Sequence, residues 1–244
     1  MCVQSQILSS SAVGDDLPMT MQVAMIAADG IVLASDLKWV TTGNDPRGPF
    51  RLPEYKSKIK IDKEIAICCA GNDMTHATRV ADEILLHWRD GDGDEVQRIQ
   101  RIVVPLFKKR DFQCLIALAP PIKKLIYVRD SKFATGIGTR TEWSRSIAPT
   151  HPIQIAGDQA NDAKFWLRYY DASLPVQELK RLAAHLVVEA VNFNNAMIGG
   201  LEVVVSDSSG FIRLSDDKCR QLETEAKKRT SDMGELVLRP PSHK

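Results

Sequence analysis

The stretch from Thr20 to Asp36, TMQVAMIAADGIVLASD, decides the fold. Two apolar runs, residues 22–28 and 31–34, stand on either side of Asp29-Gly30. Asp-Gly between apolar runs is a strong short-range signal for a β-hairpin, because both residues accept the backbone angles of a tight turn. The stretch therefore predicts two paired strands that return Asp36 to the side of Thr20.

Short strands and amphipathic helices follow the hairpin in alternating groups. The predicted strands cover residues 58–61, 64–70, 113–118, 124–129, 153–156, 201–206 and 211–214. The predicted helices cover residues 74–88, 94–110, 160–167 and 175–192, and Pro105 interrupts the second of them. Residues 41–54 are polar and rich in Gly and Pro, which predicts a loop. Strand groups separated by helix pairs indicate one α+β domain whose sheets are covered by helices.

The composition is that of a soluble globular protein. The chain has 244 residues, 44% of them hydrophobic and 26% charged, which is enough to build a core. With 32 basic and 31 acidic residues the net charge is +1, so nothing attracts nucleic acid electrostatically. No apolar run approaches the roughly 20 residues of a membrane-spanning helix. We therefore expect no nucleic-acid partner and no membrane partner.

The cysteines and histidines indicate no metal site. The 5 Cys include no C-x-x-C pair, and the adjacent Cys68 and Cys69 would point to opposite faces of a strand. None of the 5 His falls in a metal-binding spacing such as H-E-x-x-H. We expect reduced, buried cysteines in a cytoplasmic protein, with no metal and no organic cofactor.

The element order and several local strings resemble the proteasome-subunit family of N-terminal-nucleophile hydrolases, in particular a bacterial proteasome β-type homologue. The resemblance covers roughly residues 20–215 and rests on the opening hairpin, on KIKI at 58–61, ICCAG at 67–71 and AMIGG at 196–200. It implies a four-layer αββα sandwich, with two antiparallel sheets between helix layers, and assembly into a homo-oligomeric ring.

The resemblance also implies a threonine-type endopeptidase that cleaves peptide bonds through an acyl-enzyme. Thr20 takes the position of the nucleophile, and its own α-amino group would be the base, since an α-amine titrates at about pH 8. Asp36 would hold the Lys58 ammonium beside Thr20, with Lys56 as the alternative lysine. Gly71 would offer its N–H to the oxyanion. A peptide or protein substrate and an unfoldase partner follow from the same resemblance.

Two departures from the family pattern leave other functions open. Asn195 and Ile198 stand where the family has an aspartate and a serine, and Asp158 ends a string where it has Gly-Ser-Gly. The first change replaces both expected polar groups, and at the second Asp158 is a candidate substitute for the serine but is not equivalent to it. One alternative is a catalytically silent homologue that acts as a structural ring subunit, and another is a hydrolase of small amides.

The residues before Thr20 decide whether it can act as a terminal nucleophile. We expect an extension or propeptide at 1–19, the proteasome-like domain at 20–218, and a charged C-terminal tail at 219–244 that forms a helix and then exposed strand or coil. Met19 replaces the glycine of self-cleaving members, but methionine aminopeptidase trims a Met-Thr start because threonine is small. We therefore hypothesise that translation starts at Met19. A competing hypothesis places the nucleophile at Cys2, exposed by trimming of Met1.

Overall fold

The computed structural model describes residues 20–45, 48–71, 73–134, 141–157, 164–193, 195 and 198–238. One group of strands is β1 (Gln22–Ile26), β2 (Ile31–Ser35), β10 (Ile153–Ala156), β11 (Glu202–Asp207) and β12 (Gly210–Arg213). A second group is β5 (Ile59–Ile61), β6 (Ile65–Ala70), β7 (Phe112–Leu118), β8 (Lys124–Ala134) and β9 (Thr141–Pro149). A separate pair is β3 (Lys38–Asp45) and β4 (Gly48–Tyr55). The helices are α1 (Met74–His87), α2 (Glu95–Val103), α4 (Val176–Phe193) and α5 (Asp216–Leu238), with 3₁₀ turns η1 (Val104–Leu106) and η2 (Lys164–Tyr169).

The two larger groups each form a five-stranded sheet in which all neighbours are antiparallel. The strand order is β10-β1-β2-β11-β12 in the first sheet and β5-β6-β7-β8-β9 in the second. The hairpin β1–β2 therefore lies inside the first sheet, with β10 on one side and β11 on the other. The result is a mixed fold of helices and antiparallel sheets, which confirms the α+β class.

The predicted opening hairpin is confirmed in position and register. Gln22 pairs with Ser35 and Ile26 pairs with Ile31 around the Asp29-Gly30 turn. The turn is also tied to a helix, because Asp29 Oδ1 accepts a hydrogen bond of 2.7 Å from the N–H of Val176, the first residue of α4. An acceptor at this position satisfies one of the unpaired N–H groups at a helix start.

Local capping residues define the first two helices. Asp73 caps α1 by accepting the N–H of His76 at 2.9 Å. Asp94 and Gln97 form a reciprocal capping box at the start of α2. Pro105 lies in η1, directly after α2 ends, so the predicted interruption is confirmed.

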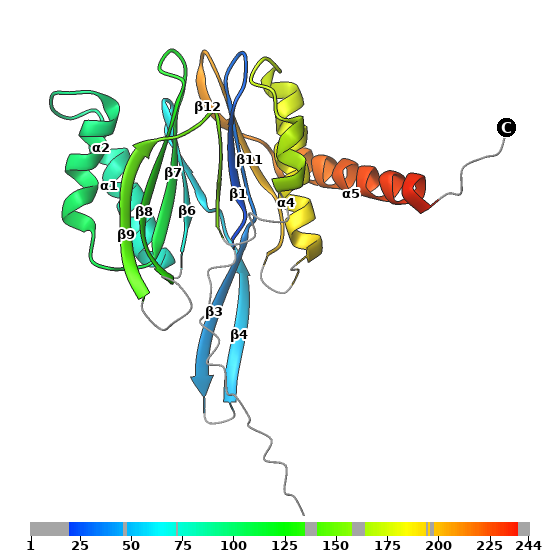
Figure 1. The fold of residues 1–244 in the computed structure, drawn as a ribbon, viewed down its shortest axis with the longest axis horizontal. Coiled ribbons are helices and arrows are strands. Elements are labelled where there is room, and N and C mark those ends of the chain that lie inside the picture. The colour runs from blue at the N-terminus through cyan, green and yellow to red at the C-terminus, as the bar shows by residue number, and fades with distance from the viewer. Residues whose placement is uncertain are drawn as a thin grey trace, which may run out of the picture.

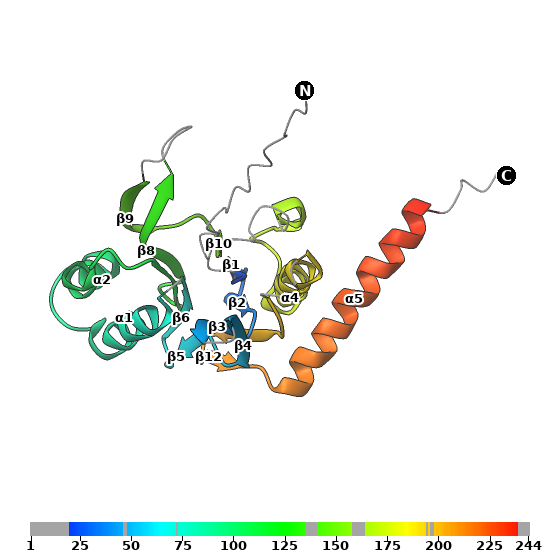
Figure 2. The ribbon, with the colours of Figure 1, turned by 90° about the horizontal axis from the view of Figure 1, so that it is seen from below.

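Apolar side chains hold the molecule together in three clusters. In the view from below, α1 and α2 lie against the second sheet and α4 lies against the first (Figure 2). One cluster joins the first sheet to α4 and the start of α5; its members include Val23, Val203, Leu186 and Leu222. Another joins the second sheet to α1 and α2; its members include Ile67, Ile116, Ile84 and Ile99. The last lies between the sheets and includes Leu33, Ile59, Leu115 and Val204. Adjacent residues of a strand enter different clusters, as Cys68 and Cys69 do, because side chains alternate across a pleated strand.

The prediction of a loop at residues 41–54 is wrong. This segment lies within the ribbon β3–β4, in which Lys38 pairs with Tyr55 and Asp45 with Gly48, and the ribbon extends away from the body (Figure 1). The prolines at 49 and 53 pointed to a loop. However, both strands of a two-stranded sheet are edge strands, where a residue without an N–H is tolerated.

The helix predicted in the C-terminal segment is confirmed. It is α5, which begins at Asp216 and continues to Leu238, and residues 239–244 lie outside the described part of the chain. Cys219, Leu222 and Ala226 are buried at helical spacing, so the first half of α5 belongs to the core. The far half projects from the body (Figure 1).

The turn of the opening hairpin gives a stability prediction. A Cβ at Gly30 would lie 1.9 Å from the carbonyl oxygen of Ser206, which is backbone inside a strand and cannot move freely. Gly30→Ala should therefore lower the free energy of unfolding by about 3 kcal/mol or more. Gly199→Ala is the control, because its Cβ would meet side-chain atoms no closer than 3.3 Å. Urea denaturation measures both, and equal stability of the two variants would contradict the prediction.

Candidate active site

Thr20, Asp36 and Lys58 meet in one buried group at the end of the first sheet. Lys58 Nζ donates hydrogen bonds to Thr20 Oγ1 at 3.0 Å and to Asp36 Oδ2 at 2.8 Å. All three residues are buried, with Thr20 retaining 5% of its exposure and Asp36 none. An ammonium within hydrogen-bond distance of a hydroxyl favours the alkoxide form of that hydroxyl. The arrangement can therefore activate Thr20 as a nucleophile.

The opening hairpin puts Asp36 beside Thr20. Thr20 directly precedes β1, and Asp36 directly follows β2. The Met21 N–H donates to Asp36 Oδ1 at 3.0 Å, and the Asp36 N–H donates to the Met21 carbonyl at 3.1 Å. The Lys38 N–H donates to Asp36 Oδ2 at 3.1 Å. The carboxylate thus has backbone donors on both oxygens in addition to Lys58, which holds its orientation.

Lys58 rather than Lys56 enters this group. The Lys58 side chain is 2% exposed and pairs with Asp36. The Lys56 side chain is 60% exposed, pairs with Glu54 and lies over the Trp39 ring. Lys56 is therefore a surface residue.

Burial acts on both charges of the Lys58–Asp36 pair. Loss of water raises the pKa of Asp36, and the nearby Lys58 charge opposes that rise. Loss of water lowers the pKa of Lys58, and Asp36 and, more weakly, Glu202 oppose that fall. Each charge is therefore sustained by the other, and the Lys58 proton is held less tightly than on an exposed lysine.

Two glycines, Gly71 and Gly157, have conformations that only glycine adopts readily, and only Gly157 contacts the group. Gly71 follows β6 with φ +131, and a Cβ there would lie 2.4 Å from the Asp111 carbonyl oxygen. Gly157 has φ +96, and a Cβ there would lie 1.7 Å from the Thr20 carbonyl oxygen. Gly157 therefore packs directly against the Thr20 backbone, whereas the contacts of Gly71 are with the start of β7.

Neither Ile198 nor Asn195, which form the first departure from the family pattern, brings a hydroxyl or a carboxylate to the group. Ile198 is fully buried in the cluster with Val203 and α4. Asn195 is exposed, and its carbonyl accepts a hydrogen bond of 2.8 Å from Lys38 Nζ. Asp158, Met19 and Cys2 lie outside the described residues.

Sequence reasoning missed Glu202, which is buried beside Lys58. Its Oε2 accepts the Lys58 N–H at 3.2 Å. The available signal was its position in the run LEVVVS at 201–206, because Glu202 shares a strand face with Val204, which packs between the sheets. A lone acid on a buried face requires partners.

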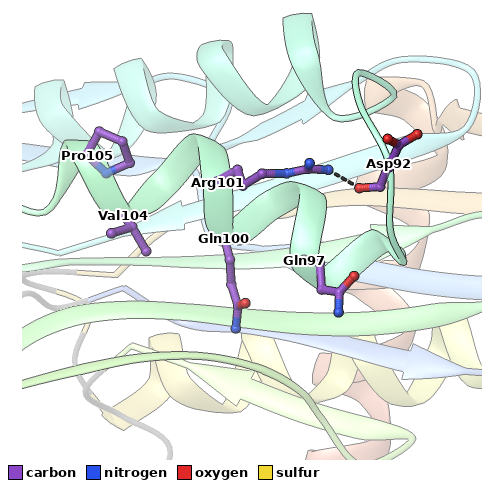
Figure 3. Close-up of a pocket in the computed structure, with 6 residues that line it drawn as sticks. All are labelled: Asp92, Gln97, Gln100, Arg101, Val104 and Pro105. Atoms are coloured by element: carbon purple, nitrogen blue, oxygen red, sulfur yellow. Dashed lines mark hydrogen bonds between the residues drawn. The ribbon is translucent and has the colours of Figure 1, made fainter.

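The structure has a hollow elsewhere, along α2. Figure 3 shows this pocket of about 520 Å³, lined by Asp92, Gln97, Gln100, Arg101, Val104 and Pro105. Arg101 crosses it to bind the Asp92 carbonyl. The pocket includes none of the residues around Thr20.

The described part of the chain holds no candidate metal site and no candidate membrane span. No three His, Cys, Asp or Glu side chains gather there in a way that could hold a metal ion. No described helix is long and apolar enough to cross a membrane. Cys68, Cys69, Cys114 and Cys219 are all buried free thiols.

Comparison with solved structures identifies the fold. Anbu (ancestral β-subunit) from Yersinia bercovieri matches with a TM-score of 0.65 and 12% identity, over 92% of this chain and 99% of that one. This chain has the Anbu fold. A Gly-1 mutant of Anbu from Hyphomicrobium sp. strain MC1 matches with a TM-score of 0.60 and 14% identity, over 92% and 100% of the two chains. No family model and no curated protein matches the sequence.

These matches correct the family assignment. The sequence pattern indicated a bacterial proteasome β-type homologue, and that interpretation is wrong, because the matching structures are Anbu proteins, a proteasome-like but distinct family. The strings behind it describe the hairpin and the strand-to-helix turns. Related folds share such local features, so the strings do not separate one family from the next.

The buried pair gives a stability prediction that also separates the two lysines. Lys58→Met leaves Asp36 buried without its partner and should cost about 3–5 kcal/mol of unfolding free energy. Adding Asp36→Asn removes the second charge, so the double variant should be more stable than Lys58→Met alone. Lys56→Met, on the surface, should change stability by no more than about 0.5 kcal/mol. Urea denaturation tests the order, and equal costs at 56 and 58 would refute it.

Proposed function

We propose that this protein is a threonine-type N-terminal-nucleophile hydrolase that cleaves peptide bonds through an acyl-enzyme on Thr20. The observation that carries the proposal is that Lys58 Nζ contacts both Thr20 Oγ1 and Asp36 Oδ2 within a buried group. Asp36 fixes the ammonium, and the ammonium faces the hydroxyl. An ammonium in this position increases the nucleophilicity of the hydroxyl. A threonine with a purely structural role at the end of a strand does not require a buried cation.

The proposed reaction uses Thr20 as both nucleophile and base. With Thr20 as the first residue, its neutral α-amine accepts the Oγ1 proton while Oγ1 attacks the substrate carbonyl. Lys58 stabilises the negative charge that develops on Oγ1. The α-ammonium then protonates the leaving amine, which leaves an ester on Thr20. A water molecule, deprotonated by the same α-amine, hydrolyses the ester and restores Thr20.

Gly71 is the proposed oxyanion donor in this reaction. A backbone N–H aimed at the developing oxyanion stabilises the tetrahedral intermediate in a site that excludes water. The left-handed φ of Gly71 supports the proposal only in part, since the close approach of Asp111 already requires glycine. Gly157, which packs against the Thr20 carbonyl, would hold the Thr20 backbone in place.

The layer arrangement is compatible with the αββα sandwich of this hydrolase class. Helices α1 and α2 pack on one sheet and α4 packs on the other, while an apolar cluster joins the sheets. The free cysteines fit a reducing, cytoplasmic compartment. A homo-oligomeric ring with an unfoldase partner is part of the proposal, and the β-subunit in the printed name of one similar structure supports the subunit role.

A silent structural subunit is the second candidate, and Ile198 favours it. Isoleucine has no hydroxyl, unlike the serine that the family has at this position, and Ile198 is completely buried among apolar side chains. It therefore offers Thr20 no polar partner. If that hydroxyl is required for proton transfer, the remaining group would hold the sheet together without reacting.

Covalent labelling separates the two candidates. A chain expressed from Met19 should lose that methionine and begin at Thr20. Intact mass spectrometry should then show one added molecule of a peptide epoxyketone or β-lactone per chain. Thr20→Ala should abolish the addition, because both the hydroxyl and its position at the terminus are needed.

Thr224→Ala is the matched control, since Thr224 lies on the exposed side of α5 and its hydroxyl bonds to the Arg220 carbonyl. It should label like the unmodified chain. A chain that begins at Thr20 and stays unlabelled after prolonged incubation would favour the silent subunit over the hydrolase.

A further inference from the structure

Glu202 is a buried acid on which three hydrogen-bond donors converge. Its Oε1 accepts the Ser57 hydroxyl at 2.7 Å, and its Oε2 accepts the Lys58 N–H at 3.2 Å. Arg213 Nη1 lies 2.7 Å from Oε1. Because all three groups donate, both carboxyl oxygens act as acceptors, and an amide in its place would turn its NH₂ toward a donor.

Arg213 binds the same segment, residues 57–59, through the Ile59 carbonyl. Its Nη2 donates to the Ile59 carbonyl at 2.6 Å, and the Ser57 hydroxyl also lies 2.9 Å from that carbonyl. Glu202 is on β11 and Arg213 on β12, both in the first sheet, whereas residues 57–59 lead into β5 of the second sheet. Glu202 and Arg213, on the first sheet, therefore bind the backbone that leads into the second sheet.

The segment that Glu202 and Arg213 bind, residues 57–59, includes Lys58. The Lys58 N–H bonds to Glu202, its carbonyl accepts the Cys69 N–H at 3.0 Å, and its ammonium bonds to Asp36 and Thr20. Every polar group of Lys58 is thus held. The position of Nζ against Thr20 depends on this backbone, and a displacement of about 1 Å in such a group can cost about a hundredfold in rate.

We propose that Glu202 and Arg213 form a positioning pair that fixes the Lys58 backbone, and with it the ammonium, against Thr20. The inference rests on the proposed function, because it assigns the pair to the same nucleophile. It adds two residues that do not touch Thr20 and act through Lys58.

The charges around Lys58 support the same role. Among the described residues, Asp36 and Glu202 accept hydrogen bonds from Lys58 and Arg213 pairs with Glu202, and Thr20 adds its α-amine if it is the first residue. The negative charge of Glu202 favours the charged form of Lys58 and opposes the lowering of its pKa by burial. Loss of that charge should therefore make Lys58 release its proton at lower pH.

Glu202→Gln is the decisive variant and Glu64→Gln its control. Both substitutions remove one negative charge, but Glu64 is exposed and pairs with Arg89 on the surface. The full chain beginning at Thr20, labelled with ¹³Cε-lysine, reports the Lys58 titration by NMR, with the signal assigned by its absence in Lys58→Arg. The proposal expects Glu202→Gln to move the Lys58 midpoint to lower pH and Glu64→Gln to leave it in place.

The labelling reaction supplies the second readout. Glu202→Gln should slow the maximal rate of labelling about tenfold or more, with little change in the inhibitor concentration for half-maximal rate. Glu202→Asp, which keeps the charge, should recover part of that loss. If Glu202→Gln does not fold, Arg213→Gln, which leaves the carboxylate in place, should slow labelling in the same way.

The proposal would be overturned if Glu202→Gln left both the Lys58 midpoint and the labelling rate unchanged. If Glu202→Gln does not fold and Arg213→Gln is used in its place, an unchanged labelling rate in Arg213→Gln would overturn it. If the wild-type chain itself does not label, the proposed function fails. In that case the NMR titration still decides whether Glu202 acts on Lys58.

Discussion

The ion pair between Lys58 and Asp36 is the constraint around which the rest of this structure is arranged. Two charges with almost no exposure are costly unless each retains a close partner and further hydrogen bonds. The hairpin supplies those bonds to Asp36 through the Met21 and Lys38 N–H groups. The β11–β12 hairpin supplies them to the Lys58 backbone through Glu202. The pair is thus tolerated because three segments far apart in sequence meet at it.

This pair also links the stability of the fold to its chemistry. The group that satisfies Asp36 is the same ammonium that contacts the Thr20 hydroxyl. A change that loosens the pair would disturb both, so the site and the packing at this end of the sheets cannot vary independently. A similar dependence holds at Gly157, which packs so closely on the Thr20 carbonyl that no larger residue fits.

The Anbu fold holds the residues around the Lys58–Asp36 pair in position. Two antiparallel sheets meet through an apolar cluster that includes Leu33, Ile59 and Val204. Glu202 and Arg213 lie on the faces of β11 and β12 that turn toward this cluster, as Val204 and Phe211 do. They place ionic contacts at the margin of an otherwise apolar interface. Apolar contacts provide most of the stabilisation between sheets, whereas directional bonds of this kind define their relative position.

Sequence alone determined the elements whose signals are local. The Asp29-Gly30 turn, the apolar strand at 65–70 and the helical periodicity that begins at 74 each depend on neighbours a few residues away, so they could be read directly. Thr20, Asp36 and Lys58 were named as one group from the hairpin and a family resemblance, although the family itself was wrong. The ribbon at 38–55 was missed because its prolines give the same signal as a loop.

Only the tertiary structure decided which lysine is buried and what holds it. The sequence pattern favoured Lys58 and left Lys56 as the alternative, and the structure buries Lys58 against Asp36 while Lys56 lies on the surface. Glu202 meets Lys58 across 144 residues of chain, through the packing of one sheet on the other. Contacts of this kind have no local signal, because they depend on the position of whole sheets rather than on the preferences of neighbouring residues.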